Sequence, residues 1–354
     1  MQSNKSSNLI IVILLIFSLG CNNVKSNNNE SNKVDNQTES AISRKEIGDQ
    51  QAFRQVNKLE KDSMKSIKKE SQEEKEDAFF DDSLKLFANI SRFDEKTQNI
   101  FKEKGFKEYA LITTKRIDPD GNERINKETI KSYIEKRFPN KGAEEILIID
   151  WEQRKYKDLK KPEKSQEFKA AEKEFKKLVN YIKELRPNLV VGIYGLPYRV
   201  FNNKYPHYAK KNKFLGLLKA VDIITPSLYG ESTDSERSKN ENDVFLKNTI
   251  ELSIEYADQL GKPLYFFIWE MTSSKENRLL PVEEFRRKIE TIVAYQSKNK
   301  WVQGVIYWTP AKANYYLNEM KASASQGITK ANSTDKDPES FRNTVISNYL
   351  SEVF

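Results

Sequence analysis

Seven short apolar runs, separated by charged segments with helical spacing, constrain the fold of this chain more than any other feature. The stretch Ile146–Ile149 is apolar at every position, as expected for a strand that is covered on both faces of a parallel sheet. Between two runs, Phe168, Phe175 and Ile182 recur on one helical face, which ends before Pro187. Alternating strands and helices predict an α/β fold of repeated βα units. The runs are Leu84–Ile90, Tyr109–Thr113, Glu145–Glu152, Leu189–Pro197, Asp222–Tyr229, Pro263–Glu270 and Gln303–Pro310.

The βα units extend over about 270 residues and contain no glycine-rich dinucleotide fingerprint. This combination favours a closed (β/α) TIM-like barrel over an open doubly wound sheet. We expect seven parallel strands, or eight if one strand leaves no clear run. The barrel domain is expected to occupy residues 79–354.

The first twenty residues have the pattern of an export signal. Lys5 is followed by an apolar run from Leu9 to Leu19, which is too short for a membrane-spanning helix, and Gly20 precedes Cys21. The segment from Phe17 to Cys21 resembles the lipobox of bacterial lipoproteins, although leucine is expected one position earlier. We therefore predict a signal peptide over residues 1–20 and acylation of Cys21 by fatty acids such as palmitate. The lipid would hold the protein on a membrane of the bacterial cell envelope. The alternative is an ordinary secretory signal with an incidental cysteine.

Residues 21–78 differ in composition from the rest of the chain. They are rich first in Asn and Ser and then in Lys and Glu, and they lack a sustained apolar stripe. Such a segment cannot bury enough apolar surface to fold by itself. We expect it to be a flexible tether between the lipid and the barrel.

Composition excludes several classes of site. Apart from Cys21 the chain has no cysteine, and His207 is its single histidine, so disulfides and Cys/His metal clusters are excluded. The chain has no G-x-S-x-G motif and no glycine-rich phosphate loop. We expect no metal, no cofactor and no nucleic-acid partner. The formal charge of +8 fits an anionic partner or simply a solvated lysine-rich face.

Polar and aromatic residues follow the predicted strands at the ends where a parallel barrel has its active site. Strand periodicity places Asp150 and Glu152 on the face that points to the barrel axis, and it turns Trp151 toward the helices. By the same alternation, three aromatic residues close later runs and face inward. They are Tyr194, Tyr229 and Trp308.

Two carboxylates in one confined pocket cannot both ionise easily, so the pKa of one of them should rise. A general acid beside a stabilising anion suits glycoside cleavage, and aromatic walls suit sugar rings. Carboxylates on one strand are badly placed to flank a bond, which favours substrate assistance. In that scheme a 2-acetamido oxygen of the sugar attacks the anomeric carbon, Asp150 stabilises the oxazolinium, and Glu152 protonates the leaving oxygen.

Four motifs resemble those of the animal-type hyaluronidases, glycoside hydrolase family 56. The resemblance implies a barrel hydrolase in which Glu152 is the acid/base and Asp150 positions the acetamido group. It further implies that Tyr194, Tyr229 and Trp308 bind the substrate. The motifs are Ile149-Asp150-Trp151-Glu152, similar to I-D-W-E; Gly192-Ile193-Tyr194-Gly195-Leu196-Pro197, similar to G-F-Y-G-F-P; Pro226-Ser227-Leu228-Tyr229, similar to Y-P-S-I-Y; and Gly304-Val305-Ile306-Tyr307-Trp308, similar to G-V-V-L-W.

Three hypotheses of function follow. The first is a lipid-anchored hydrolase of an N-acetylhexosamine polysaccharide such as hyaluronan or chondroitin. The second is a non-catalytic adhesin that binds glycans or matrix on a glycosidase fold, with Asp150 and Glu152 held in structural contacts. The third is a hydrolase of peptidoglycan or chitin oligomers. Lys and Arg residues of 154–164 and 199–213 are expected at the mouth, where they could hold uronate carboxylates or simply form a solvated face. Glu270 is expected to be available as a conventional nucleophile opposite Glu152.

Overall fold

The fold is described from a computed structural model that defines residues 84–200, 210–236, 238–273, 277–310, 312–325 and 337–354. Residues Phe80–Phe354 form one compact unit. The predicted signal peptide, Cys21, the tether and His207 lie outside the described residues. Within the described part, no helix combines the length and the apolar character that crossing a membrane requires.

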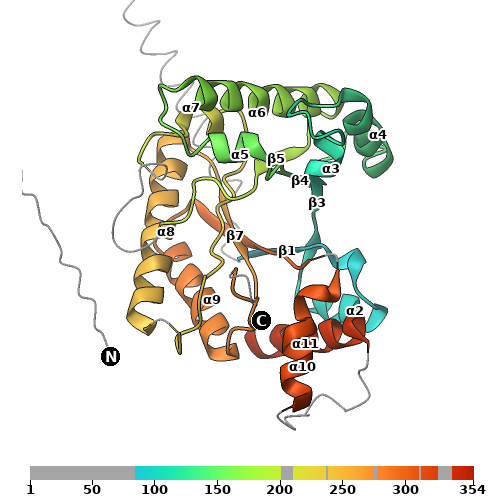
Figure 1. Cartoon of the computed structure of the whole chain (residues 1–354), viewed down its shortest axis with the longest axis vertical. Coiled ribbons are helices and arrows are strands. Elements are labelled where there is room, and N and C mark those ends of the chain that lie inside the picture. The colour runs from blue at the N-terminus through green and yellow to red at the C-terminus, as the bar shows by residue number, and fades with distance from the viewer. Residues whose placement is uncertain (1–83, 201–209, 237, 274–276, 311, 326–336) are drawn as a thin grey trace, which may run out of the picture. The chain divides into compact units, whose positions relative to one another are not determined.

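Parallel strands form the centre of the domain, as predicted (Figure 1). They pair in two groups, one in the order β2-β1-β7-β6 and the other in the order β3-β4-β5. Six of the seven apolar runs contain regular strands, and the second run is extended toward its N-terminus by β2. The strands are β1 (Lys85–Ala88), β2 (Lys107–Glu108), β3 (Ala110–Thr113), β4 (Ile146–Asp150), β5 (Val190–Ile193), β6 (Leu264–Ile268) and β7 (Val302–Tyr307).

The fifth run joins the two groups of strands without forming a regular ladder. Thr225 makes a parallel bridge to Tyr194 after β5, and Ser227 makes a parallel bridge to Phe267 of β6. On the other side β2 and β3 are consecutive in the chain, and the N–H of Tyr109 between them donates to the carbonyl of Ala88. Strand neighbours therefore follow one another around a (β/α) barrel whose hydrogen bonding is interrupted at two places.

Direct pairing of β1 with β7 leaves no place for an eighth strand between them. Gly304 of β7 lies opposite Lys85 of β1, and a Cβ atom at this glycine would come within 2.3 Å of the Lys85 carbonyl oxygen. The same atom would meet the ring of Tyr265 at 2.8 Å. Glycine at this position thus permits the close approach through which the last strand meets the first.

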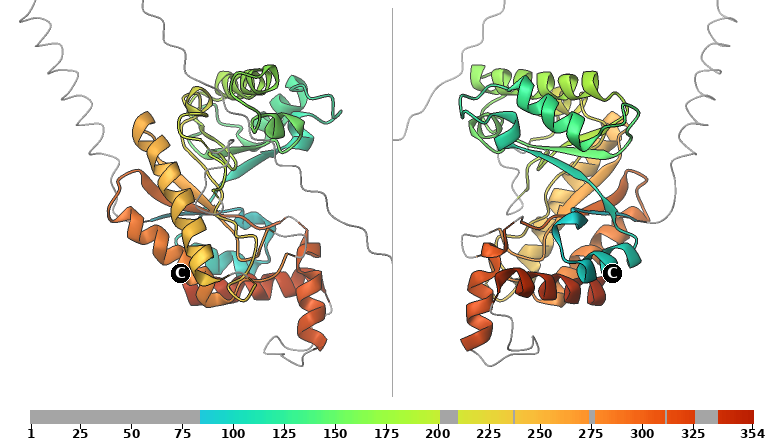
Figure 2. Two further views of the ribbon diagram at one scale, coloured as in Figure 1. Left: turned by 60° about the vertical axis from the view of Figure 1, so that its left-hand side comes forward. Right: turned by 90° about the vertical axis from the view of Figure 1, so that its right-hand side faces the viewer.

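Helices surround the strands, and the two views of Figure 2 show them on the outside of the domain. Most of the long helices follow a strand and return the chain to the start of the next one, as in repeated βα units. The helices are η1 (Ile90–Arg92), α2 (Glu95–Glu103), α3 (Thr114–Ile117), α4 (Lys127–Arg137), α5 (Arg154–Asp158), α6 (Gln166–Leu185), α7 (Leu215–Leu218), α8 (Lys239–Leu260), α9 (Val282–Gln296), η2 (Ala313–Tyr316), α10 (Leu317–Ser325) and α11 (Pro338–Val353).

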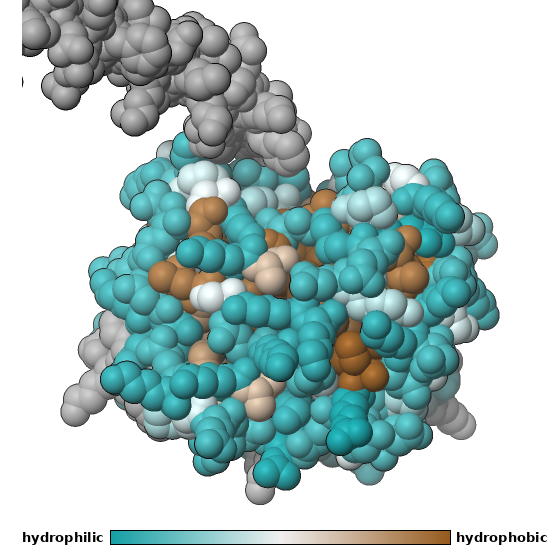
Figure 3. Space-filling model, turned by 90° about the horizontal axis from the view of Figure 1, so that it is seen from above, coloured by the Kyte–Doolittle hydropathy of each residue, from teal (hydrophilic) through white to brown (hydrophobic). Residues whose placement is uncertain are grey.

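Helix α6 confirms the helix that the periodicity predicts. The Ser165 side chain accepts a hydrogen bond from the Phe168 N–H and caps the first turn. The buried residues recur at helical spacing, and the opposite face is rich in lysine and glutamate. Figure 3 shows that the face of the molecule on this side is hydrophilic except for small separate apolar patches. The buried residues of α6 are Phe168, Ala171, Phe175, Leu178, Val179 and Ile182.

Candidate active site

The end of β4 turns its residues to opposite sides, as strand geometry predicts. Trp151 is buried, and its ring lies 5.2 Å from the ring of Phe175 in α6, measured between centroids. Glu152 lies on the other side and lines a pocket. The Thr114 hydroxyl fixes this turn because it accepts from the Glu152 N–H and donates to the Asp150 carbonyl. The helix layer thus holds Trp151 while the carboxylates face the barrel mouth.

The pocket beside Glu152 has a volume of about 300 Å³. Its wall combines tyrosines, cations and two acids, and it lies where β4, β5 and the fifth run end. Among the described residues Glu152 takes part in no ion pair that would consume its charge. A ligand in this pocket can therefore contact the Glu152 carboxyl group directly. Its lining residues are Glu152, Tyr156, Lys157, Lys160, Tyr194, Gly195, Tyr198, Arg199, Ser227 and Glu231.

The three predicted aromatic residues lie together at this end of the barrel. The ring centroids of Tyr194 and Tyr229 are 6.0 Å apart, and Tyr229 stacks on Trp308 at 5.8 Å. Tyr194 also lines the pocket, whereas Tyr229 is buried behind it and Trp308 is half-buried. Asp150 does not line the pocket itself but lies close enough to influence the pKa values of Tyr194 and Tyr229. The structure thus brings all five sequence-predicted barrel residues to one end of the sheet.

The two carboxyl groups titrate abnormally. Burial raises the pKa of Asp150 to about 7, the negative charge of Glu152 adds to this effect, and Arg92 opposes it. Partial burial against the pocket wall also raises the pKa of Glu152, although Arg199 and Lys160 oppose the shift. Below about pH 7 the pair therefore retains a proton, as expected for confined carboxylates. The larger resolved shift is that of Asp150, the deeper of the two.

Three buried polar atoms near the pair make no hydrogen bond to any residue that the structure describes. They are Asp150 Oδ1, the Tyr109 hydroxyl and the Tyr229 hydroxyl. Asp150 contributes to the raised pKa of both tyrosines, which shows that the three groups share one environment. An unpaired buried polar atom costs about 1–3 kcal/mol. Such a cluster suits a polar ligand that supplies donors and acceptors to all three.

Arg199 links the pocket wall to the loop after the fifth run. Its guanidinium donates to the Tyr229 carbonyl at 2.7 Å and to the Ser273 hydroxyl at 2.8 Å. Of the cations predicted at the mouth, Lys157, Lys160 and Arg199 do line the pocket. Two others, Arg154 and Lys155, pair instead with Glu123. Residues 201–209 of the second predicted loop lie outside the described residues.

Sequence reasoning missed Arg92, Tyr109 and Glu231. Arg92 and Glu231 each follow the end of a strand run, so the rule that selected Glu152 would also have found them. Tyr109 carries no such signal because it stands at the beginning of its run. Its position at the site follows from the break between β2 and β3.

Glu270 is not placed as a nucleophile. It is fully buried, it does not line the pocket with Glu152, and its carboxylate accepts a hydrogen bond from the Tyr316 hydroxyl. Burial raises its pKa to about 7. The expectation that Glu270 is available as a conventional nucleophile is therefore wrong for this structure. The described residues also contain no group of three or more His, Cys, Asp or Glu side chains that could hold a metal ion.

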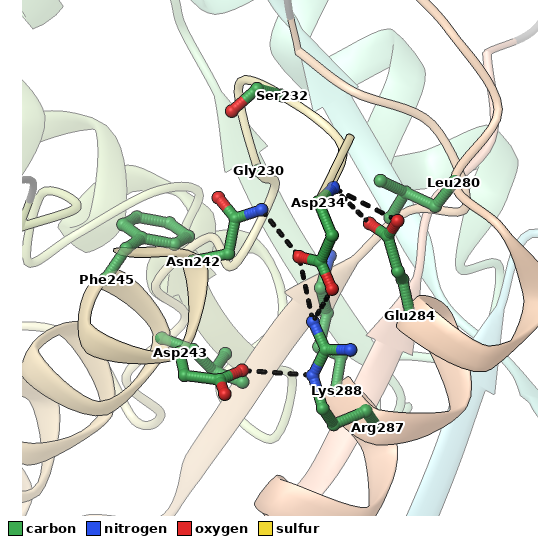
Figure 4. A pocket seen from close by; sticks show the side chains of 11 residues that line it. Gly230, Ser232, Asp234, Asn242, Asp243, Phe245, Leu280, Glu284, Arg287 and Lys288 are labelled. Carbon is green, nitrogen blue, oxygen red and sulfur yellow. Dashed lines mark hydrogen bonds and ion pairs between the residues drawn. The ribbon is translucent and has the colours of Figure 1, made fainter. Parts of the chain in front are cut away.

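A second, smaller pocket of about 40 Å³ lies beneath the loop that follows Tyr229 (Figure 4). The Asp234 carboxylate pairs with Arg287 at 2.8 Å and accepts from the Asn242 side chain at 2.8 Å. The Asp234 N–H donates to the Glu284 carboxylate at 3.0 Å. These contacts tie the loop to α8 and α9, and the loop in turn positions the end of the fifth run beside the larger pocket.

Lys288 lines this second pocket and should destabilise the fold at neutral pH. Its ammonium group is buried and makes no hydrogen bond to a described residue, and burial lowers its pKa to about 8. Lys288→Met should raise the free energy of unfolding at pH 7 by about 1–3 kcal/mol, measured by urea denaturation. Because the folded-state pKa is lowered, the penalty is complete below pH 8 and disappears as the pH approaches the ordinary lysine value of 10.5.

The difference between Lys288→Met and the unmutated protein should therefore shrink as the pH is raised. Lys298→Met is the control, because Lys298 is an exposed lysine just after the same helix. It should leave the free energy of unfolding nearly unchanged at every pH. A constant difference between Lys288→Met and the unmutated protein across the alkaline range would contradict the assignment of a strained buried ammonium.

The comparison with solved structures gives the fold a precedent. The crystal structure of bee venom hyaluronidase matches with a TM-score of 0.51 and 12% sequence identity, over 69% of this chain and 98% of the hyaluronidase. This chain has a glycosidase barrel fold. A second structure of bee venom hyaluronidase, in complex with a hyaluronic acid tetramer, has a TM-score of 0.47 and 14% identity, over 70% and 97% of the two chains. A family GH18 chitinase from Pseudoalteromonas aurantia has a TM-score of 0.39 and 10% identity, over 65% and 81%.

Sequence comparison adds no relative. No protein-family model matches the chain, and no curated protein matches it. At this level of identity the structural likeness establishes the fold alone, and the chemistry has to be argued from the site.

Proposed function

We propose that this protein is a lipid-anchored glycoside hydrolase that cleaves an N-acetylhexosamine-containing polysaccharide, of the hyaluronan or chondroitin kind, by a substrate-assisted retaining mechanism. One observation carries the proposal. A carboxyl pair with raised pKa values lies at the C-terminal end of β4, beside an open pocket and among buried polar atoms that lack partners. Raised carboxyl pKa values in a cleft are typical of catalytic sites.

The mechanism assigns one role to each member of the pair. Glu152 lines the pocket, so it can protonate the glycosidic oxygen as the bond to the anomeric carbon breaks. The 2-acetamido oxygen of the same sugar attacks that carbon, and the ring that forms carries a positive charge. In the reactive form of the pair the proton is on Glu152 and the deeper Asp150 is a carboxylate, which stabilises this charge. Water activated by Glu152 opens the oxazolinium and returns the proton, with net retention.

The position of the other carboxylates near the site, among the described residues, supports substrate assistance. Glu270 ends the sixth predicted run, but it is fully buried and accepts a hydrogen bond from the Tyr316 hydroxyl. Glu231 lines the pocket from the loop after the fifth run and not from the end of a strand. A mechanism that needs no protein nucleophile therefore fits the site best.

The proposal is tested by product sizing. The full-length protein, purified in detergent, is incubated with hyaluronan, chondroitin, chitin oligomers and peptidoglycan, and the products are separated by size. Shortened chains from at least one of these polymers are expected, since all of them carry 2-acetamido groups. Binding without any shortening would favour the non-catalytic adhesin, and shortening of chitin or peptidoglycan alone would favour the alternative hydrolase.

The lipid anchor is a separate proposal. Cys21→Ser should shift the protein from the detergent phase to the aqueous phase in detergent partitioning, because the signal segment alone is too short to span a bilayer. Labelling with a radioactive fatty acid should also disappear in this variant. The matched control is Ser18→Ala, which changes a small residue of the same segment and leaves the acyl acceptor in place. Equal partitioning of Cys21→Ser and the unmutated protein would exclude the lipid anchor at this residue.

A further inference from the structure

The aromatic wall of the site continues beyond the three residues already described. The ring of Trp308 contacts Trp269 edge to face with centroids 4.8 Å apart, and Trp269 contacts Tyr315 in the same manner at 6.0 Å. Trp269 also lies 5.7 Å from Tyr229. A series of ring contacts therefore leads from Tyr194 in the pocket to Tyr315.

Exposure differs along this series. Trp269 is only 3% exposed and serves as a buried support, whereas Tyr315 is 42% exposed. Among the described residues Tyr315 and Val293 are the exposed large hydrophobic side chains. An isolated exposed apolar residue needs no explanation. Tyr315 is different, because ring contacts connect it to the aromatic wall of the site.

The short helix η2 holds Tyr315 in place. Tyr316, the next residue, is fully buried and donates its hydroxyl hydrogen bond to Glu270. Two consecutive residues of η2 thus contact two consecutive residues after β6. Tyr315 packs edge to face on Trp269, and Tyr316 donates a hydrogen bond to Glu270. A preorganised tyrosine ring offers contact area at a low entropic cost.

We propose that Tyr315 is an outer sugar-binding platform, on which a ring of the polysaccharide stacks at a distance from the scissile bond. The inference rests on the proposed function and extends it to the length of the substrate. A sugar ring matches a tyrosine because the ring has an apolar face and hydroxyl groups, and the tyrosine has an apolar ring and a polar tip. A ligand confined to the pocket beside Glu152 does not reach Tyr315, so the platform selects for long chains.

The test is the dependence of kcat/KM on substrate length. Hyaluronan oligosaccharides and chitin oligomers, each from the tetrasaccharide to the dodecasaccharide, are given to the full-length protein and to Tyr315→Ala. The value for the unmutated protein should rise with length, and Tyr315→Ala should lose about tenfold on the longest chains and progressively less on shorter ones. Tyr315→Phe retains the ring and should follow the unmutated protein.

Val293→Ala is the matched control. Val293 is exposed to a similar extent, but it lies in the last turn of α9, which leads to the start of β7 at the opposite end of the barrel from the site. It should leave the length dependence unchanged. Tyr315→Ala would overturn the platform if it matched the unmutated protein at every length, or if it lost the same factor at every length, as a general structural defect would produce.

The proposed function and the platform fail in different ways. Turnover by the unmutated protein with no effect of Tyr315→Ala rejects the platform and leaves the hydrolase standing. Absence of turnover rejects the hydrolase, and calorimetric binding of the same oligomers then decides the platform: tighter binding of long chains that Tyr315→Ala abolishes supports it. Absence of binding at every length rejects both.

Discussion

Glu152→Gln should lower kcat by about 100-fold or more, the usual contribution of a positioned general acid. Glutamine preserves the shape of the side chain and its place in the pocket wall, but it cannot deliver a proton to the glycosidic oxygen. Binding of oligosaccharides should persist because the aromatic wall is unchanged. Steady-state kinetics on the polymer identified by product sizing gives kcat, and calorimetry with a long oligosaccharide gives the affinity.

Glu231→Gln is the matched control for this substitution. Glu231 lines the same pocket, but it lies on the loop after the fifth run and not beside Asp150 at the end of β4. Its loss should reduce kcat far less than the loss of Glu152. A Glu152→Gln protein that turns over substrate at an undiminished rate would remove Glu152 from the mechanism. An equal loss in both variants would mean that the charge of the pocket matters rather than the acid.

Asp150→Asn should also be severe, with a loss of about 100-fold in kcat, since a neutral amide cannot stabilise the positive oxazolinium. Glu270→Gln should be mild in comparison, because substrate assistance needs no protein nucleophile and Glu270 is buried under Tyr316. The same kinetic assay compares both variants. A covalent glycosyl-enzyme trapped on Glu270, or full turnover of a substrate without the 2-acetamido group, would replace substrate assistance by the two-carboxylate mechanism.

The pH dependence separates a chemical effect of Asp150→Asn from unfolding. Activity of the unmutated protein requires one proton on the pair, so it should decline above the pKa of about 7 at Asp150. In Asp150→Asn the neighbouring negative charge is removed, and the alkaline limb of the remaining activity should move to lower pH.

Stability should change in the opposite direction to activity. The folded-state pKa of Asp150 lies above its ordinary value of 3.8, so the folded protein becomes less stable as the pH rises from about 4 to 7. Asp150→Asn removes a buried carboxylate and should therefore stabilise the fold above pH 7 while it lowers kcat. A variant that lost activity and stability together would point to a structural role instead.

The local geometry of strands allowed much of the site to be predicted. Apolar residues on both faces of Ile146–Ile149 predicted a parallel strand under helices, and the alternation of the next three residues predicted that Trp151 turns outward. Both predictions are confirmed, because β4 occupies this run and Trp151 packs on Phe175. Periodicity of this kind depends only on the chain itself and needs no knowledge of its neighbours.

Other features depend on which distant segments meet. The fifth run makes only isolated bridges because β5 and β6 contact it at separate residues. Arg92 follows β1 and Tyr109 precedes β3, yet both lie close enough to Asp150 for their charges to interact. The sequence shows none of these pairings, since strand neighbours are selected by packing across the whole barrel.

Glu270 shows most clearly what the sequence determined and what only the tertiary structure decided. Its position after an apolar run correctly places it at the same end of the barrel as Asp150 and Glu152, because parallel strands end together. Whether a carboxylate at that end meets the substrate depends on what covers it. Tyr316, more than forty residues further along the chain, closes over Glu270, whereas a pocket remains beside Glu152. Alternation along a strand fixes the direction of a side chain locally, but its burial is decided by residues that the chain brings back from far away.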